Sequence, residues 1–219
     1  MINGYIPAAR FLPFLSWTDV AALPDKSNTV IVLPTGAIEQ HGPHLPCSVD
    51  SVISSGVAGH ALARLPATIP AYAIPPIVYG KSEEHLHFPG TLTLSGDTLL
   101  HTLLEIAESL YRAGFRKLLM INGHGGQPQI LQIACREMRL RHGDFIAIPH
   151  DVFNVPPTPA TREQGEGLLD SLAASWAQAI IEIHRMAWVE RREPTWGKQH
   201  WHGFVQSLPP SFAAESREP

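Results

Sequence analysis

Short apolar runs that each lead into a polar loop and a helical pattern constrain the fold of this chain more than any other feature. Strands are expected at Thr29–Leu33, within Thr68–Ile77, at Lys117–Ile121 and at Phe145–Pro149. Helical patterns are found at Asp50–Leu65, with Ser48 or Asp50 as the cap, at Ser95–Arg112, at Pro128–His142 and from about Thr161 to Met186. Strands that alternate with helices favour an α/β fold, with a mostly parallel sheet and helices on both faces.

Length and composition set the class of protein. The chain has 219 residues, of which 44% are hydrophobic and 16% charged, so one domain is expected over residues 1–219. Residues 28–150 carry the clearest patterns, and residues 190–219 are expected to be loosely ordered. The net charge of −4 and the lack of a long basic run argue against a nucleic-acid partner. No membrane span or signal peptide is expected, and two cysteines favour the cytoplasm.

The first polar loop concentrates side chains that bind metals. It places Glu39, His41, His44 and Asp50 directly after the apolar run Val30–Pro34. Glu39 and His41 are two residues apart, so in an extended chain both side chains point the same way. Crowded carboxylates repel one another and are costly when buried, and a divalent cation would supply the missing charge. Mixed oxygen and imidazole ligands suit Zn²⁺, Mn²⁺ or Fe²⁺ better than Ca²⁺.

A second loop of this kind carries His124. The strand pattern Lys117–Ile121 runs into Asn122-Gly-His-Gly-Gly-Gln127 and then into a helix. Loops at the carboxyl ends of parallel strands open on one edge of the sheet, so His124 is expected to join the ligands of the first loop. Two plainer alternatives stay open. The first loop could only cap a helix, and the glycine turn could bind phosphate through its amides, although it lacks the spacing of known phosphate motifs.

A third polar stretch, Tyr79–Thr91, contains His85 and His87. From the residues alone, His85 either contacts substrate or supports the metal ligands, and the alternative is that both histidines are only solvated. Cys47 lies in the first loop without an evident base beside it and is interpreted as a small packing residue.

Three motifs together resemble those of the creatininase, or creatinine amidohydrolase, family. They are Leu33-Pro-Thr-Gly-Ala-Ile-Glu-Gln-His-Gly-Pro-His-Leu-Pro46 with Asp50, Gly80-Lys-Ser-Glu-Glu-His85 with Phe88-Pro-Gly-Thr91, and Ile121-Asn-Gly-His-Gly-Gly126. The resemblance implies a three-layer α/β metal hydrolase that cleaves amide-type C–N bonds, holds one or two divalent ions and forms a homo-oligomer, commonly a hexamer. By motif it implies Glu39, His41, Asp50 and His124 as metal ligands, with Asp50 bridging two ions.

The sequence departs from the family after the last motif. Members usually carry a later segment of the form His-Ala-Gly-Glu-x-Glu-Thr-Ser, which supplies another acid and a histidine for proton transfer, and this segment is not found here. Instead, Phe145–Pro149 runs within a few residues into Val155–Gly165, which resembles the closing segment of the family. An internal segment is therefore expected to be missing. Glu163 and Glu166 fit the final helix better than the absent motif and are not assigned as ligands.

Together these observations predict a metal-dependent hydrolase of a small amide, cyclic amide or formamide. Zn²⁺ is the expected ion, with Mn²⁺ or Fe²⁺ as alternatives. The catalytic proton donor is unassigned, although His85 or His150 could take that role, and the missing segment is expected to weaken activity. The alternative is a shortened, non-catalytic homologue that serves as a binding or assembly subunit. The expected partners are a small-molecule substrate and copies of the same chain, with no nucleic acid and no membrane.

Overall fold

The computed structural model describes residues 2–152 and 162–187 of the chain. One compact unit spans Met1–Met186. The expectation of a single domain over residues 1–219 stays a prediction, because the second part of the chain is not described. The loose ordering expected for residues 190–219 likewise lies outside the described residues.

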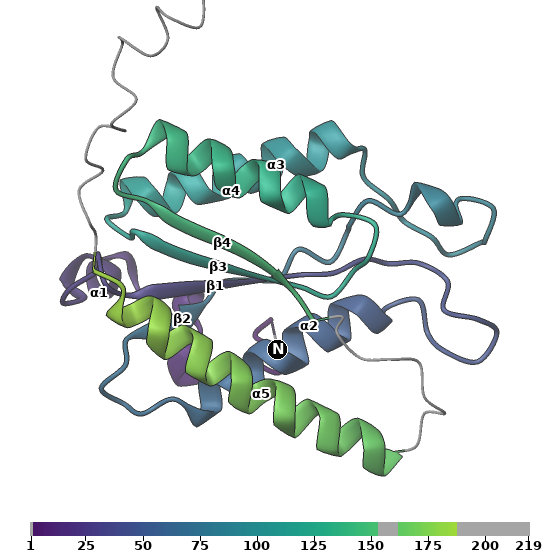
Figure 1. Cartoon of the computed structure of the whole chain (residues 1–219), viewed down its shortest axis with the longest axis horizontal. Coiled ribbons are helices and arrows are strands. Elements are labelled where there is room, and N and C mark those ends of the chain that lie inside the picture. Colours follow the sequence, from purple (N-terminus) through teal and green to yellow (C-terminus); the bar gives the residue numbers. More distant parts are fainter. Residues whose placement is uncertain (1, 153–161, 188–219) are drawn as a thin grey trace, which may run out of the picture. The chain divides into compact units, whose positions relative to one another are not determined.

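The centre of this unit is a parallel sheet (Figure 1). Its strands are β1 (Val30–Thr35), β2 (Ala71–Ala73), β3 (Lys117–Asn122) and β4 (Ile146–Asp151), in the order β2-β1-β3-β4. The pairing of β1 with β3 runs from Val30 opposite Lys117 to Thr35 opposite Asn122. Every pairing in this sheet is parallel, so the α/β class predicted from the sequence is confirmed.

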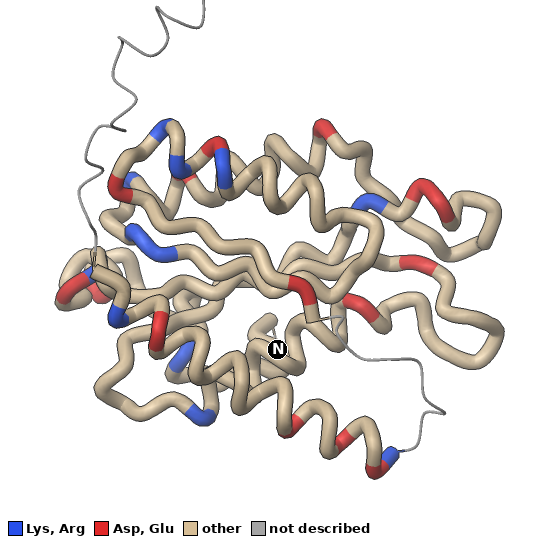
Figure 2. The backbone as a smooth tube through the Cα atoms, viewed as in Figure 1, with Lys and Arg blue, Asp and Glu red and all other residues tan. Residues whose placement is uncertain are grey.

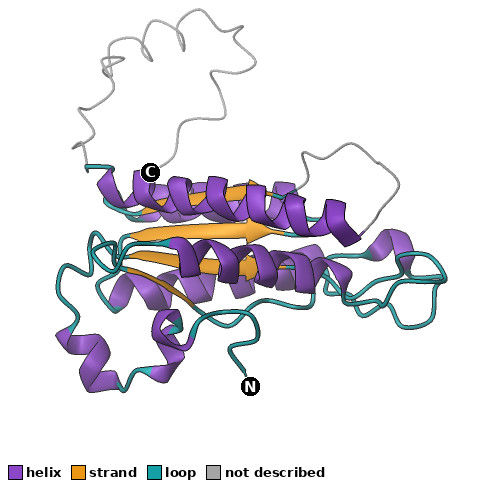
Figure 3. Cartoon of the chain, turned by 90° about the horizontal axis from the view of Figure 1, so that it is seen from below, coloured by secondary structure: helices purple, strands orange, loops and turns teal. Residues whose placement is uncertain are grey.

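Helices cover both faces of the sheet. One face carries α2 (Val49–Arg64) and α5 (Arg162–Arg185), and the other carries α3 (Gly96–Arg112) and α4 (Pro128–Arg141), as Figures 1 and 3 show. The 3-10 turns η1 (Ala8–Arg10) and η2 (Leu12–Phe14) and the short α1 (Trp17–Ala22) precede the first strand, and the 3-10 turn η3 (Glu83–His85) lies between β2 and α3. None of the helices among the described residues is long and apolar enough to cross a membrane.

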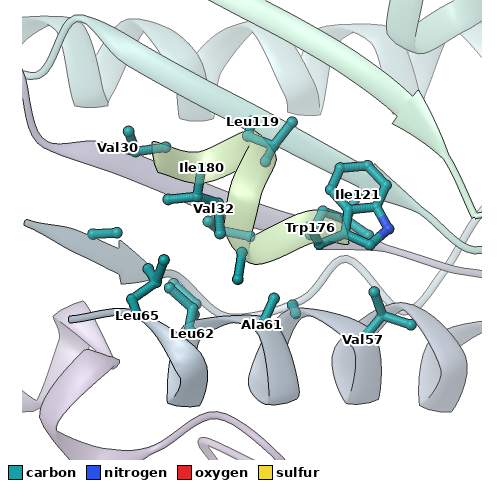
Figure 4. Close-up of a cluster of buried hydrophobic side chains, with 14 of the residues drawn as sticks. Val30, Val32, Val57, Ala61, Leu62, Leu65, Leu119, Ile121, Trp176 and Ile180 are labelled. Carbon is teal, nitrogen blue, oxygen red and sulfur yellow. The ribbon is translucent and has the colours of Figure 1, made fainter. Parts of the chain in front are cut away.

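Alternate residues of the two central strands face opposite cores. On one side, packed with α2 and with Trp176 of α5, lie Val30, Val32, Leu119 and Ile121 (Figure 4). On the other side, packed against α3 and α4, lie Ile31, Leu33, Leu118 and Met120. Successive side chains of a strand point to opposite faces, so a strand covered on both faces must be apolar throughout. Figure 2 accordingly shows strands that are almost free of charged residues.

The helix ends follow local sequence signals to different degrees. The hydroxyl of Ser95 accepts a hydrogen bond from the N–H of Thr98 at the start of α3, and Gly114, with φ +99°, follows the end of this helix. Ser48 occupies the N-cap position of α2, but its side chain makes no capping hydrogen bond, and Asp50 lies inside the first turn. Of the two predicted caps, Ser48 is therefore the N-cap residue, although it caps without a side-chain hydrogen bond, and Asp50 is not, because its carboxylate is turned toward two histidines.

The connections of the sheet diverge between β1 and β3. From β1 the chain crosses through α2 to β2, and it returns through α3 to β3 on the other side of β1. These two helices cover opposite faces. Parallel α/β sheets bind ligands at the carboxyl ends of their strands where connections diverge in this way. Both loops predicted to bind metal begin here, after Thr35 and after Asn122, which pair in register.

A buried lysine joins the sheet to the C-terminal end of α5. Lys117 is only 3% exposed and begins β3. Its Nζ donates hydrogen bonds to the backbone carbonyls of His184, at 2.6 Å, and Met186, at 2.8 Å. Carbonyls at this end of a helix lack partners within the helix, and the helix dipole favours a positive charge beside them.

We predict that Lys117→Met lowers the free energy of unfolding by about 1.5–3 kcal/mol, the usual range for hydrogen bonds to a charged group. The substitution keeps the apolar stem and leaves two carbonyls without their donor. Urea denaturation of the metal-free protein measures the loss. The control is Lys26→Met, because Lys26 makes one exposed bond of 3.3 Å to Ala21, and its effect should stay within about 0.5 kcal/mol. Equal losses in both variants would contradict the role given to Lys117.

Candidate metal centre

Three elements bring ligand side chains together at the edge of the sheet where β1 and β3 end. Glu39 follows β1, Asp50 lies in the first turn of α2, and His124 lies in the turn between β3 and α4. These residues are 6%, 3% and 2% exposed, respectively. His41 is half-buried beside them. The structure thus brings together the four residues predicted from the sequence, and their binding of a metal stays a prediction.

Asp50 lies between the two imidazoles. Its Oδ1 is 2.9 Å from Nε2 of His41, and its Oδ2 is 2.9 Å from Nδ1 of His124. The second contact has the distance of an ion pair but not the alignment of a hydrogen bond, so Oδ2 has no hydrogen-bond partner. A carboxylate that presents one oxygen to each of two histidines is placed to bridge two ions.

Backbone carbonyls determine which nitrogen of each imidazole is free. Nδ1 of His41 lies 3.2 Å from the carbonyl oxygen of Glu39, and Nε2 of His124 lies 2.7 Å from that of Lys81. A carbonyl can only accept, so these two nitrogens carry hydrogen and donate. The remaining nitrogens both face Asp50. Metal-binding histidines are typically held in this way, with one nitrogen donating to a carbonyl and the other toward the ion.

Glu39 adds a second buried carboxylate. Its Oε1 is 3.4 Å from Nδ1 of His124 and 3.7 Å from Nε2 of His85. Two ligand atoms that each lie about 2.1 Å from one ion are about 3.0–3.4 Å apart at common coordination angles, so the first spacing suits a shared ion. Two buried oxygens, Oε2 of Glu39 and Oδ2 of Asp50, have no hydrogen-bond partner. Such oxygens are costly unless a cation balances them, so this centre fits a divalent metal.

The ligand atoms form two sets whose members lie within 4.8 Å of one another: Glu39, His41 and Asp50 in one, and Glu39, Glu84 and His124 in the other. Sequence reasoning missed Glu84, which lies in η3 directly before His85. The signal in the sequence was the acidic pair Glu83-Glu84. A pair of acids in a loop does not show which of them turns toward a site on another loop.

Buried amide side chains hold the His124 turn in place. Oδ1 of Asn122 accepts from the N–H of His124 at 3.1 Å, and Nδ2 of Asn122 donates to the His124 carbonyl and to Asp151, both at 2.7 Å. Gln127 donates to the carbonyl of Gly36 at 3.3 Å and to Oδ1 of Asn122 at 3.0 Å. These bonds join the loops after β1 and β3 to one another and to the end of β4. The supporting roles of Gln127 and Asp151 were not predicted from the sequence.

Gly123 allows the first turn of α2 to approach the loop after β3. A Cβ at this position would collide with the backbone oxygen of Asp50 and would lie 3.0 Å from the Cβ of Ser54. Any larger residue would therefore push α2, and Asp50 with it, away from His124. The glycine is needed for the spacing of the centre, not only for the turn.

His85 borders the centre. It is half-buried, and besides its approach to Glu39 it has Nδ1 at 3.1 Å from the side-chain amide of Gln40. Its expected role, in contact with substrate or in support of the ligands, stays a prediction. The other residues singled out from the sequence are exposed or half-buried: His44, His87 and His150 are exposed, and Cys47 is half-buried.

The model of the creatininase family, described as creatinine amidohydrolase, matches residues 14–156, which include every candidate ligand. This chain belongs to the creatininase family. The resemblance found in the sequence is therefore confirmed. The internal shortening expected after Pro149 is not established by this match and stays a prediction.

Relatives and solved structures agree with this assignment. The mycofactocin precursor peptide peptidase of Mycolicibacterium smegmatis is 36% identical over 125 residues, covering 56% of this chain and 50% of the relative. The creatinine amidohydrolase of Pseudomonas putida is 34% identical over 164 residues, covering 70% of this chain and 62% of the relative. The chain thus spans about half of the first relative and less than two thirds of the second.

A crystal structure of creatinine amidohydrolase has a TM-score of 0.69 at 24% identity, with 81% of this chain and 99% of that chain covered. Creatininase structures described as a Zn–Zn type mutant and as Mn each have a TM-score of 0.67 at 24% identity; they cover 80% and 81% of this chain, and 98% and 99% of their own. At this identity the likeness shows the fold, so the predicted creatininase-like three-layer architecture is confirmed.

In this creatininase-family chain, His124 holds a proton more readily than a free histidine does. Burial disfavours the charged imidazole, but the contacts with Asp50 and with the Lys81 carbonyl, together with the charge of Glu39, outweigh it. The pKa of His124 is therefore raised above its ordinary value. A proton on Nδ1 takes the position that a cation would take, so proton and metal compete for this nitrogen.

We predict that metal binding releases a proton from His124 and strengthens as the pH rises through the raised pKa of this residue. Below that pKa, the Kd for Mn²⁺ should fall by up to about tenfold per pH unit, since one proton is displaced. In the metal-free protein the protonated imidazole stabilises the fold below the ordinary histidine pKa, and this contribution is lost above the raised one. Calorimetric titration in two buffers of different ionisation enthalpy counts the protons. Equal proton release from wild type and His124→Gln would contradict the prediction.

Proposed function

We propose that this protein is a metal-dependent amidohydrolase that cleaves the C–N bond of a small amide. One observation carries the proposal: Asp50 lies 2.9 Å from His41 on one side and 2.9 Å from His124 on the other, with the buried Glu39 beside them. A cluster that served only to stabilise the fold would not leave two buried carboxylate oxygens without hydrogen-bond donors. Membership of the creatininase family supports the same conclusion.

The donor set suits divalent ions on both sides of Asp50. Glu39, His41 and Asp50 would hold one ion, and His124 with Glu39 and the second oxygen of Asp50 would contribute to the other. Zn²⁺ suits these ligands best, with Mn²⁺ or Fe²⁺ as alternatives, and the related structures described as Zn–Zn and Mn support this choice. When bound, such ions activate water at neutral pH and polarise the carbonyl group under attack.

The chain's own residues hold the site rigid. Both imidazoles are tied to backbone carbonyls, and the His124 turn is tied to Asn122, so neither ring can rotate freely away from Asp50. Rigid placement of this kind lowers the cost of assembling a reactive geometry. His85 flanks Glu39 and is half-buried, and we propose that it contacts the substrate.

The names of two relatives suggest the class of substrate. One is a peptidase of a precursor peptide and the other a creatinine amidohydrolase, and both names describe cleavage of amide-type C–N bonds. We propose that the substrate is a small amide, cyclic amide, formamide or short peptide. We also propose that the chain forms a homo-oligomer, as the family resemblance predicted, which light scattering of the full chain would test.

A non-catalytic family member that binds metal is the second candidate function. The observation that favours it is the absence from the sequence of the His-Ala-Gly-Glu-x-Glu-Thr-Ser segment, which supplies an acid and a histidine. Such a protein would keep the metal centre and turn nothing over. Turnover therefore separates the two candidates, and metal content alone does not.

Replacing Asp50 by Asn should lower the metal content more than replacing His44 by Asn. Asp50 contacts both imidazoles, whereas His44 is exposed on the same loop. Loss of a bridging carboxylate weakens the binding of both ions. Asp50→Asn should therefore lose most of its metal, and the metal content of His44→Asn should match that of wild type. Inductively coupled plasma mass spectrometry measures the ratio of metal to protein after purification without chelator and reloading with Zn²⁺. Equal metal content in the two variants would rule out the bridging role.

We predict that the metal-loaded protein hydrolyses at least one member of a panel of creatinine, lactams, formamides, cyclic ureas and short peptides. Mass spectrometry detects the released products. Activity should disappear on dialysis against a chelator and return with Zn²⁺ or Mn²⁺. Glu39→Gln keeps the shape of the side chain but removes its charge, and it should lose at least about 10–100-fold in activity. A fully loaded protein that turns over no member of the panel would favour the non-catalytic candidate.

A further inference from the structure

The motifs assigned no role to Glu84, a charged side chain near the metal centre. It lies in η3, and a carboxylate oxygen lies within 4.8 Å of ligand atoms of Glu39 and His124. In the part of the chain that the structure describes, no ion pair or hydrogen bond engages this carboxylate. The adjacent Glu83 differs, since its Oε2 is 3.1 Å from Nζ of Lys81. The loop thus pairs one acid with its own lysine and leaves the other turned toward the buried ligands.

Gly126 leaves the space that the Glu84 carboxylate occupies. A Cβ at this position would collide with Oε1 of Glu84, and it would lie 2.5 Å from Nε2 of His124 and 2.6 Å from the carbonyl oxygen of Lys81. No side-chain atom fits at such distances. The glycine therefore lets the loop that carries Glu84 close over the His124 turn, with the acid at the point of contact.

A second observation, independent of the acids in this loop, indicates a cation. Glu39 is 6% exposed, and its Oε2 has no hydrogen-bond partner. The same holds for Oδ2 of Asp50, which is 3% exposed. The carboxylates of Glu39, Asp50 and Glu84 therefore converge beside two imidazoles, and none of the three pairs with a described Lys or Arg. Like charges at this spacing repel one another unless a cation lies among them.

We propose that Glu84 is a direct ligand of the ion on the His124 side of the centre. The proposal rests on the metal-dependent function argued above, and it supplies an acidic ligand in place of the one in the absent segment. The ion beside His41 would then have Glu39, His41 and Asp50 as ligands, and the ion beside His124 would have Glu39, Glu84 and His124, because the ligand atoms in each of these two sets lie within 4.8 Å of one another. Oδ2 of Asp50 also lies 2.9 Å from Nδ1 of His124. Three protein ligands and an open position are the usual pattern of a catalytic zinc site.

Comparing Glu84→Gln with Glu83→Gln tests the assignment. Both variants change one carboxylate to an amide in the same turn, but only Glu84 faces the ligands. Chelator-stripped full-length protein is titrated with Zn²⁺ alone and with Mn²⁺ alone, and native mass spectrometry and calorimetry give stoichiometry and Kd. We expect two ions in wild type and in Glu83→Gln, and one Kd raised at least about 10–100-fold in Glu84→Gln. The metal-free variants should unfold at the same temperature, which excludes a general loss of structure.

The outcomes separate this proposal from the proposed function. A wild type that binds neither Zn²⁺ nor Mn²⁺ overturns both. If wild type binds metal and Glu39→Gln loses it, but Glu84→Gln keeps every wild-type Kd, only the assignment of Glu84 is overturned. Glu84→Gln with unchanged metal binding and lost turnover overturns it as well, because Glu84 would then act on the substrate.

The Glu84→His variant provides a spectroscopic readout of direct coordination. Histidine offers a different ligand atom in the same place, so this variant should recover part of the affinity lost in Glu84→Gln. It should also shift the visible absorption bands of the Co²⁺-loaded protein relative to wild type, whereas Glu83→His should not. Identical Co²⁺ spectra in wild type and Glu84→His would overturn direct coordination.

Discussion

The structure depends on how two buried carboxylates, Glu39 and Asp50, are neutralised at the carboxyl edge of the sheet. They are 6% and 3% exposed, and among the described residues only histidines form ion pairs with them. An uncompensated buried carboxylate costs several kcal/mol, so this edge is stable only with protonated imidazoles or bound cations. In the metal-free protein, the raised pKa of His124 favours a protonated imidazole, whose positive charge partly neutralises the carboxylates. A divalent ion provides the same compensation with more charge.

The sheet and the helices packed on its two faces provide the stability that offsets this cost. β1 and β3 are buried on both faces, and each large apolar side chain buried there contributes about 1.5–3 kcal/mol. The two strands end in register at Thr35 and Asn122, so their loops start side by side. α2 then brings Asp50 against the second loop across Gly123. The ligands are thus carried on short segments fixed at one end by regular structure, which suits a site whose spacing must not change.

The sequence predicted the layers well because full burial leaves a continuous apolar signal. The strands over Val30–Thr35 and Lys117–Asn122 were predicted to within two residues, and the ligands predicted from the two motif loops do converge. The bounds of β2 and β4 were predicted less accurately, because they depend on contacts between loops. β2 has only three residues within the predicted range, and β4 continues to Asp151, whose polar side chain bonds to Asn122.

Glu84 shows why the rest of the site could not be predicted. An acid in an irregular loop has no periodicity that fixes its direction, and only the packing of that loop over Gly126 turns it toward His124. The same applies to Gln127, whose amide joins loops that are 91 residues apart in the chain. The expected internal shortening concerns the segment between β4 and α5. Residues 153–161 of that segment lie outside the described residues, so the shortening stays a prediction.

Anomalous X-ray diffraction from crystals loaded with Mn²⁺ tests the central claim most directly, because it locates each ion without relying on activity. We expect two anomalous peaks on opposite sides of Asp50, one beside Nε2 of His41 and one beside Nδ1 of His124, each about 2.0–2.2 Å from its ligand atoms. Density with no peak near either imidazole, and with the Asp50 carboxylate still in direct contact with both rings, would contradict it.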